Sequence, residues 1–373
     1  MKHLRYLCIR TSTIRGPRLE KVALSSLFNS LPSIRNVQVL DLLDFHYPIM
    51  LPAGIKNLIN LRHLILPPSS VILCGISKLT CLQTLKIVVV KDGNHEGGGL
   101  GEIEDLASLT GSCCISSIDY ANNVEDLKKA NINGKKHIRR LFIDWEQSLD
   151  IMFFPSDESS FDVRIYFAAK VRVEKQSFEL EEAKLEALRP HNNLKELEIH
   201  NYPWILFLSW LGDPIVLDRD LSCLRSISII GCAMLKNIKI VQSSSLRKLL
   251  VQQCPKITSL HGICSLHRLE KLEIRWCYNL LISTEEILPS KLQFVCFKYC
   301  RELTSIPGLQ NLPSLKELKL YGCLKLELTL EEKLSTMPSV LEIIDCPRLE
   351  KWCQRYGYKY VSDKSLLPIA NNI

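Results

Sequence analysis

The chain has 373 residues, 46% of them hydrophobic, and 47 basic residues face 40 acidic ones. This length exceeds one compact core of ordinary size, whereas a repeat array grows in one dimension and has no such limit. The charge excess is too small to require a nucleic-acid partner. The cysteines number 15, and they do not form the paired clusters of a secreted disulfide framework.

The N-terminus lacks the apolar segment of a secretory signal, and the strongly apolar run Trp204–Leu211 is too short to span a bilayer. We therefore expect free thiols, no membrane span, and a location in the cytoplasm, with the nucleus as a second compartment.

Residues 1–145 carry an irregular repeat. Lines of the type L-x-x-L-x-L begin at Leu4, Val37, Leu61, Leu82, Ile115 and Ile138. Segments between them, such as LPAGIKNLIN from Leu51, are predicted to form short helical turns. The first line has no cap before it, so we expect an upstream segment or a partner to cover this end of the stack.

Two segments of this region could bind anions. The glycine-rich stretch 91–101 lacks the pattern of a phosphate-binding loop, and we predict a flexible insertion. The basic stretch Asn131–Arg140 lacks the interleaved aromatic residues of a nucleic-acid site, so we predict a solvated surface.

Residues 146–193 form a degenerate repeat or insertion with one helix near 178–188. Ser177 is the predicted N-cap, Leu180, Leu185 and Leu188 are predicted to share the buried face, and Pro190 marks the end. Glu181 and Glu182 are predicted to be acids of the helix start rather than a carboxylate pair.

Residues 194–352 carry leucine-rich repeats that become regular from residue 224. Six lines of the form L-x-x-L-x-(L/I/V/F)-x-x-C-x-x-(L/I) begin at Leu224, Leu246, Leu269, Leu292, Leu315 and Pro338, with steps of 22, 23, 23, 23 and 23 residues. Two apolar residues spaced two apart point the same way from a short strand, and stacked repeats bury them as a continuous row. The cysteine of each line is predicted to pack in the core where the strand ends.

The pattern predicts an α/β leucine-rich repeat solenoid, with a curved parallel β-sheet on its concave face and short helices or turns on its convex face. Residues 353–373 lose the period, and we predict that they form a tail that closes the stack.

The sequence contains no assembled constellation for catalysis, and we predict neither an enzyme nor a cofactor. His261, Cys264 and His267 come nearest to a metal site. They are three candidate ligands without a second paired cluster, so we predict no metal.

Several blocks resemble a known family. LPAGIKNLINLRHLILP, GISKLTCLQTLKIVVV, EALRPHNNLKELEIHNYPWILFLSWLGD and the later L-x-x-L-x-I-x-x-C-P-x-L lines are similar to the repeat region of plant intracellular nucleotide-binding, leucine-rich repeat immune receptors, especially the coiled-coil class of grasses. No phosphate-binding loop or signalling domain accompanies them. The resemblance therefore implies the repeat region alone, and we expect no nucleotide binding.

The outward residues of the strands should form columns on the sheet, where basic and aromatic side chains suit a protein interface. The predicted binding residues are Lys248, Gln252, Lys271, Glu273, Arg275, Trp276, Phe294, Lys298, Tyr299, Glu317, Lys319 and Tyr321. The resemblance implies recognition of a pathogen effector or a guarded host protein, and restraint of the receptor's nucleotide-binding module in cis or in trans. The alternative is a substrate adaptor of a ubiquitin ligase.

Overall fold

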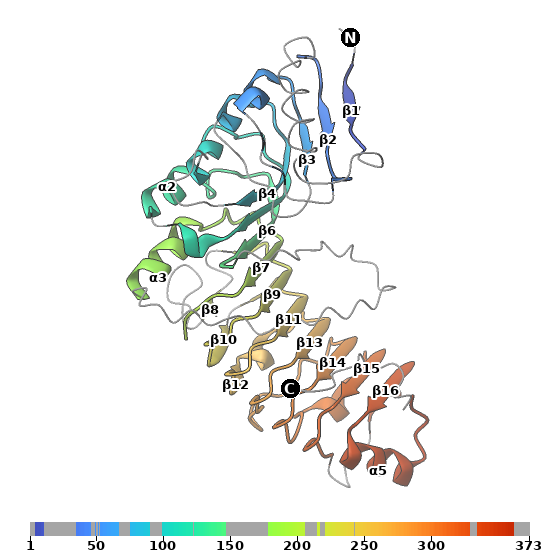
Figure 1. Ribbon diagram of the computed structural model, residues 1–373. Helices are drawn as coiled ribbons and strands as arrows, with labels where there is room; N and C mark the ends of the chain where they lie inside the picture. Colours follow the sequence, from blue (N-terminus) through green and yellow to red (C-terminus); the bar gives the residue numbers. More distant parts are fainter. Residues whose placement is uncertain are drawn as a thin grey trace. The chain divides into compact units, whose positions relative to one another are not determined.

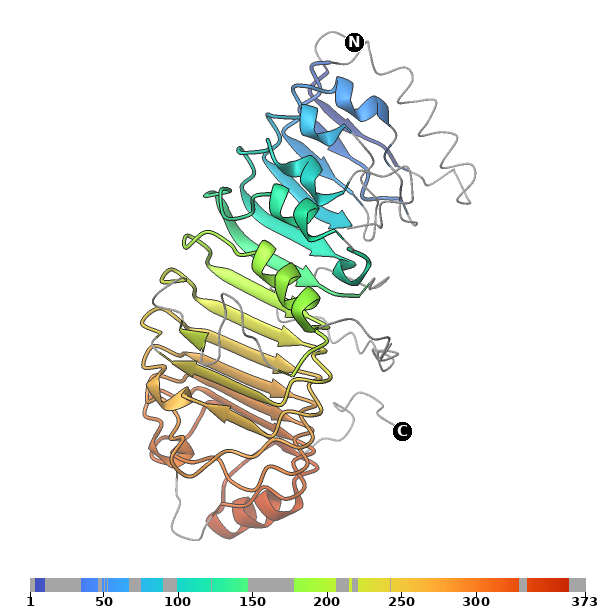
Figure 2. The same ribbon diagram turned by 90° about the vertical axis from the view of Figure 1, so that its left-hand side faces the viewer.

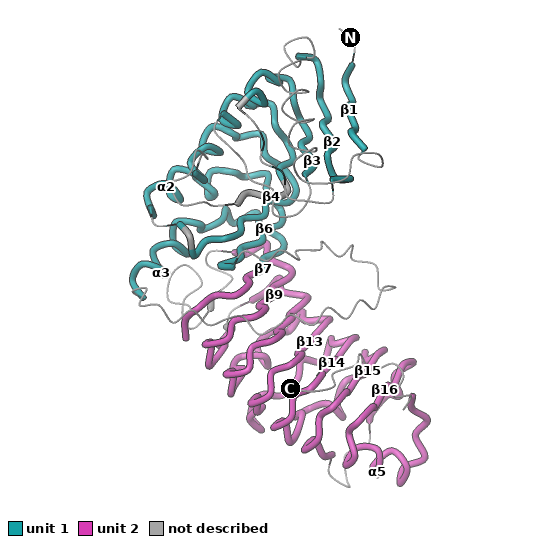
Figure 3. Tube along the Cα trace, viewed as in Figure 1, with its two compact units in different colours: residues 1–157, 176–198 teal, residues 158–175, 199–373 magenta. Residues whose placement is uncertain are grey.

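The chain forms two units of stacked strands in a computed structural model, which describes residues 4–361 except 11–34, 46–48, 50, 52, 67–74, 90–98, 122, 147–177, 206–214, 217–220, 242 and 329–333. Unit 1 comprises Met1–Asp157 and Gln176–Glu198, and unit 2 comprises Glu158–Lys175 and Ile199–Ile373 (Figure 3). Most of the glycine-rich insertion, the predicted cap Ser177 and the tail from residue 362 lie outside the described residues. The predicted domain boundaries stay predictions.

Unit 1 contains short parallel strands that follow one another in chain order (Figure 1). They are β1 Tyr6–Cys8, β2 Val39–Asp41, β3 His63–Ile65, β4 Thr84–Val89, β5 Gly111–Ser116 and β6 Ile138–Asp144. The inward leucines stay aligned along β2, β3 and β4, where Leu40 pairs with Leu64 and Leu64 with Leu85. The register shifts on both sides of β5, so this unit is less regular than the next.

Short helices return the chain between these strands, and Figure 2 shows them in a row on one side of the unit 1 strands. They are η2 Ala53–Asn57, η3 Ile76–Lys78, η4 Leu100–Ile103, η5 Ile118–Tyr120, α2 Val124–Lys129 and α3 Phe178–Ala187. Strand β7, Glu196–His200, lies where the two units divide.

Unit 2 holds parallel strands of five residues each in one unbroken register. They are β9 Ser226–Ile230, β11 Lys248–Gln252, β13 Lys271–Arg275, β14 Phe294–Lys298, β15 Glu317–Tyr321 and β16 Val340–Ile344. On the return side lie a second sheet, β8 Ile215–Val216, β10 Asn237–Val241 and β12 Ser259–His261, and the turns η6 Ile263–Ser265 and η7 Leu309–Asn311. One strand occurs in each of the six regular lines, and the predicted solenoid fold is confirmed.

The cysteines of the six lines form a buried column, as predicted. Each has 0% of its surface exposed. The thiols of Cys254, Cys277 and Cys300 lie 3.9, 3.9 and 3.8 Å from carbonyl oxygens of the preceding strand, those of Ile229, Val251 and Ile274. Burial raises the pKa of Cys254 well above that of an ordinary thiol. These thiols therefore serve packing and weak hydrogen bonding.

Each of the six strands in the regular lines of unit 2 is followed by one residue with left-handed backbone, directly before the cysteine. These residues are Gly231, Gln253, Trp276, Tyr299, Gly322 and Asp345, with φ between 53° and 69°. The amide of each of the first five donates to the last carbonyl of the following strand, at 2.7 to 2.9 Å. This turn aims the chain into the core, and it costs a non-glycine residue about 1–2 kcal/mol.

Carboxylates of one repeat complete the helical turns of the repeat before it. The hydrogen bonds run from Gly75 N to Glu102 Oε2 (3.0 Å), from Gly101 N to Asp126 Oδ1 (3.2 Å) and from Gly262 N to Glu286 Oε1 (2.9 Å). A backbone amide at a helix start lacks an intrahelical partner, so a carboxylate there stabilises the turn.

The last strand of unit 2 has a covered edge. Helix α5, Pro347–Tyr356, follows β16 and ends at Gly357. Beyond it, Val361 accepts a hydrogen bond from Ile343 N (3.1 Å) and donates one to Leu341 O (3.0 Å). The backbone groups of β16 are thereby satisfied at an edge that would otherwise be open.

Helix α3 adds a buried ion pair that the sequence analysis did not predict. Glu181 lies in the first turn of the helix, as predicted, but both Glu181 and Lys184 have fully buried side chains and form an ion pair at 2.6 Å. The indole of Trp145 donates to the same carboxylate at 2.7 Å. Leu185 and Leu188 are buried as predicted, whereas Leu180 is half-buried.

Replacing one partner of this buried pair should destabilise the protein. We expect Lys184→Met to lower the free energy of unfolding by roughly 3 kcal/mol, because the Glu181 carboxylate is left in the core without its cation. Lys128→Met is the matched control, since Lys128 also pairs with a glutamate three residues before it but on the exposed face of α2. Its effect should stay within about 0.5 kcal/mol. Equal losses in urea denaturation would contradict this account.

The cysteine column should resist alkylation in the native protein. Iodoacetamide at mildly alkaline pH should label the exposed thiols of Cys81, Cys223 and Cys264. The column thiols should react only after denaturation, because they are buried and the alkylating reagent cannot reach them. Peptide mass spectrometry reads out each site, and labelling of Cys277 in the native protein would show that the column opens.

Candidate protein-binding surface

The outward side chains of β11, β13, β14, β15 and β16, with Trp276 and Tyr299 at the strand ends, form the surface that we call the outward face. Leu249 and Val251 of β11 point into the core, with 1% and 0% exposed, so Lys248, Leu250 and Gln252 point outward. The register extends this alternation across the sheet. The structure places every predicted binding residue on this face or at its rim, and their role in binding stays a prediction.

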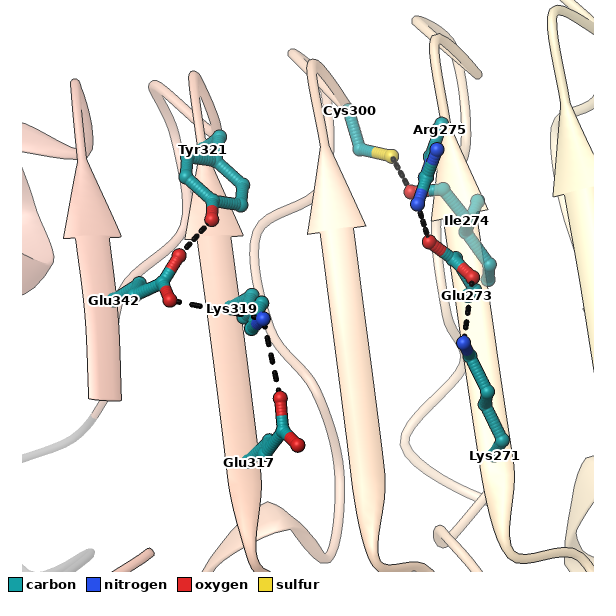
Figure 4. Close-up of polar contacts among 9 residues, drawn as sticks. All are labelled: Lys271, Glu273, Ile274, Arg275, Cys300, Glu317, Lys319, Tyr321 and Glu342. Atoms are coloured by element: carbon teal, nitrogen blue, oxygen red, sulfur yellow. Dashed lines mark hydrogen bonds and ion pairs between the residues drawn. The ribbon is translucent and has the colours of Figure 1, made fainter. Parts of the chain in front are cut away.

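The carboxylates of the outward face are already paired (Figure 4). On β13, Glu273 pairs with Lys271 at 3.5 Å and with Arg275. On β15, the Lys319 ammonium lies 3.1 Å from Glu317 and 3.7 Å from Glu342 of the next strand. The hydroxyl of Tyr321 donates to Glu342, and the pKa of that phenol is raised by burial and by this carboxylate.

Aromatic rings lie among these charges. The Phe294 ring lies below two ammonium groups, with Lys271 Nζ 4.3 Å and Lys319 Nζ 5.6 Å from its centroid. At the rim, the rings of Trp276 and Tyr299 stack with centroids 6.0 Å apart and planes at 18°. The Tyr299 ring covers Gly322, where an added Cβ would lie 2.5 Å from a ring carbon.

Lys298 has a different environment from the other lysines of the face. Only 8% of its surface is exposed. Its ammonium lies 4.8 Å from the Tyr321 ring and 5.9 Å from the Trp276 ring, and within the described part of the chain it forms no ion pair. Burial lowers its pKa, and the charge of Arg275 lowers it further. The charged ammonium at this position lowers the stability of the folded state, because desolvation disfavours the charged form.

Lys319, one strand away, shows the opposite balance. Burial lowers its pKa, but its hydrogen bond to Glu317 and the charge of Glu342 outweigh that effect, and the pKa is raised. Two lysines of one sheet face thus differ because only one of them has carboxylate partners.

The outward face is less exposed than the sequence suggested. We expected the outward residues to point to solvent, but Glu273, Lys298 and Tyr321 are buried. Strands about 4.8 Å apart bring long side chains into contact, so they cover one another. The sequence analysis also missed Cys296 and Ile344, which form an apolar cluster with Tyr321, against which Phe294 packs. Extending the outward columns through these two positions would have found them.

The structure also places the residues of the other candidate sites. His261 lies beside Glu286 at 3.7 Å, Cys264 is exposed, and no metal-binding group of three or more His, Cys, Asp or Glu occurs among the described residues. Within the basic stretch 131–140, Lys135 is not on a solvated surface. It is buried, donates to Ile103 O at 2.7 Å, and has a pKa lowered by burial.

Comparisons with known proteins agree with this architecture. The family of R13L1/DRL21 leucine-rich repeats matches residues 100–254. "Disease resistance protein RGA2" of Solanum bulbocastanum is 30% identical over 163 residues, 41% of this chain and 14% of that protein. "Putative disease resistance protein RGA1" of the same species is 26% identical over 235 residues, 56% of this chain and 21% of that protein.

The chain is a leucine-rich repeat region that is similar to parts of plant disease resistance proteins. It spans less than a quarter of the length of these relatives. Among solved structures, an internalin (inlF) from Listeria monocytogenes aligns with a TM-score of 0.43 and 13% identity over 88% of this chain and 76% of that chain, too low to carry an argument. No helix among the described residues is long and apolar enough to cross a membrane.

Two lysine substitutions in this leucine-rich repeat region should have opposite effects on stability. Lys298→Met should leave the denaturation midpoint unchanged or raise it, because it removes a desolvated charge. Lys319→Met should lower the free energy of unfolding by about 1 kcal/mol, because Glu317 and Glu342 lose their cation. Since the pKa of Lys298 is lower in the folded state, the wild type should gain stability relative to Lys298→Met as pH rises toward the ordinary lysine range. A Lys298→Met variant as unstable as Lys319→Met would refute this assignment.

Proposed function

We propose that this chain is a recognition module of plant defence, which binds a pathogen effector or a guarded host protein through the outward face. We propose further that it restrains a nucleotide-binding module, in cis or in trans. The aromatic rim of unit 2 carries the proposal, in a chain whose relatives are disease resistance proteins. Trp276 and Tyr299 keep their rings where left-handed backbone favours glycine.

A rigid face reduces the free-energy cost of association. Five strands in one register hold the outward side chains, and the ion pairs of Glu273, Lys319 and Glu342 restrict their rotamers before any partner arrives. Ordering side chains at an interface costs about 0.5–1.5 kcal/mol for each one immobilised. Stacked aromatic residues beside basic ones are also the composition of interface hot spots.

The rim residues support recognition rather than folding. Gly231 and Gly322 adopt the same turn without a side chain, so the fold itself does not need rings at this position. The rings of Trp276 and Tyr299, at the ends of adjacent strands, form a stacked apolar surface next to Lys298. Residues with strained backbone, such as these two, are often found at binding sites.

Removal of the rim should abolish binding without loss of the fold. We expect Trp276→Gly/Tyr299→Gly to keep the wild-type free energy of unfolding to within about 1 kcal/mol, because relief of the left-handed strain offsets the lost stacking. In leaf cells, a biotin ligase fused to this variant should no longer label the proteins that the wild-type fusion labels, as measured by quantitative mass spectrometry.

Tyr278→Ala is the matched control. Tyr278 is an exposed aromatic residue two positions after Trp276, outside the outward face, where Arg301 covers its ring at 5.2 Å. This variant should keep the wild-type labelling pattern. If the rim variant folds and labels the same proteins as the wild type, the outward face is not the binding surface.

A further inference from the structure

The charges of the outward face do not balance internally. Glu273, Glu317 and Glu342 each pair with a lysine or arginine of the face. Lys298 lies on the strand between these pairs, and within the described residues it forms no ion pair and faces aromatic rings. The charge of Glu342 favours its charged form, but burial and the charge of Arg275 outweigh that effect. The end of the face near the rim therefore holds a cation that has no ion-pair partner among the described residues.

A second cation lies next to Lys298. Arg275 is its direct partner in the register of β13 and β14. One terminal nitrogen of Arg275 binds Glu273, whereas its Nε is buried and has no hydrogen-bond partner among the described residues. Like charges on neighbouring strands destabilise a sheet. An anion at this position would remove the repulsion.

The surroundings of Lys298 would strengthen such a contact. The rings of Trp276 and Tyr321 flank the ammonium, and Tyr299 stacks on Trp276. Apolar walls exclude water, and Coulomb attraction grows as the local dielectric falls. Two features lower the stability of the fold here, the desolvated ammonium of Lys298 and the left-handed backbone of Trp276 and Tyr299. A bound carboxylate would offset the first of them.

The remaining face selects the kind of anion. A nucleic-acid backbone carries a charge at every phosphate, and Glu273, Glu317 and Glu342 would repel it at neighbouring positions. A peptide segment brings one carboxylate among neutral and apolar side chains. The apolar side chains of such a segment can pack on the half-buried rings of Phe294, Trp276 and Tyr299, so the face suits a peptide better than a polyanion.

We propose that Lys298 and Arg275, with Trp276, Tyr299 and Tyr321 around them, bind an aspartate or glutamate side chain of a partner's peptide segment, whose apolar residues pack on the half-buried Phe294 ring. This inference rests on the proposed function, because it names the chemistry that the outward face recognises.

The test is selection of peptides on the full chain. A phage library of random peptides of roughly a dozen residues is panned on the wild-type protein and depleted on Lys298→Met, which the structure predicts to be folded. The peptides that remain should be enriched in aspartate or glutamate together with apolar residues. Synthetic copies should bind Lys298→Met at least about 10-fold more weakly than the wild type in fluorescence anisotropy.

Two controls isolate the site. Lys325→Met removes an exposed lysine that pairs with Glu302 outside the outward face, and it should change peptide affinity less than about twofold. Replacing the selected acid of the peptide by its amide should lose as much affinity as Lys298→Met does, and the two losses should not add, as expected of one contact measured from both sides.

The outcomes separate this inference from the proposed function. Selected peptides without acidic enrichment, a failure to select any peptide, or binding of a single-stranded RNA oligonucleotide that depends on Lys298 would overturn the inference. Loss of protein labelling in Trp276→Gly/Tyr299→Gly would still support the outward face as a protein-binding surface. If labelling is also unchanged in that variant, both proposals fail.

Discussion

The left-handed residue at the end of each strand is the constraint on which unit 2 depends. Its amide bonds to the last carbonyl of the next strand, and its conformation directs the following cysteine into the core. Because this geometry recurs in each repeat, the strands stay in one register, and side chains spaced by one repeat become neighbours on the outward face. The outward face is thus a consequence of backbone geometry, and its chemistry is set by the residues placed on it.

This arrangement separates stability from recognition. The leucines and cysteines of each line are buried almost completely, and hydrophobic burial of that kind dominates folding. The outward positions contribute less hydrophobic burial than the inward ones. They can therefore hold residues such as Lys298, Trp276 and Tyr299, which lower the stability of the fold. Proteins commonly tolerate such local costs where function needs them.

The repeat fold was predictable because the spacing of the leucines indicates both where each strand lies and which of its side chains are buried. The columns of Lys271, Phe294 and Glu317 followed from the same spacing. The burial of Lys298 was not predictable, because it depends on rings from two other strands and on their rotamers. The burial of Glu181, whose place in the first turn of α3 was predicted, was missed for a related reason. Its partner Trp145 is 36 residues away, and no local pattern connects them.

The hydrogen bonds between repeats run in both directions along the chain. Thiols such as that of Cys277 reach back to the preceding strand, whereas the turn amides, such as that of Trp276, reach forward to the following one. Carboxylates such as Glu286 complete the helical turn of the repeat before them. No repeat is therefore self-sufficient on either side. A cut in the middle of unit 2 would expose unsatisfied groups on both new ends, so exchange of single repeats between relatives requires matching donors and acceptors at both junctions.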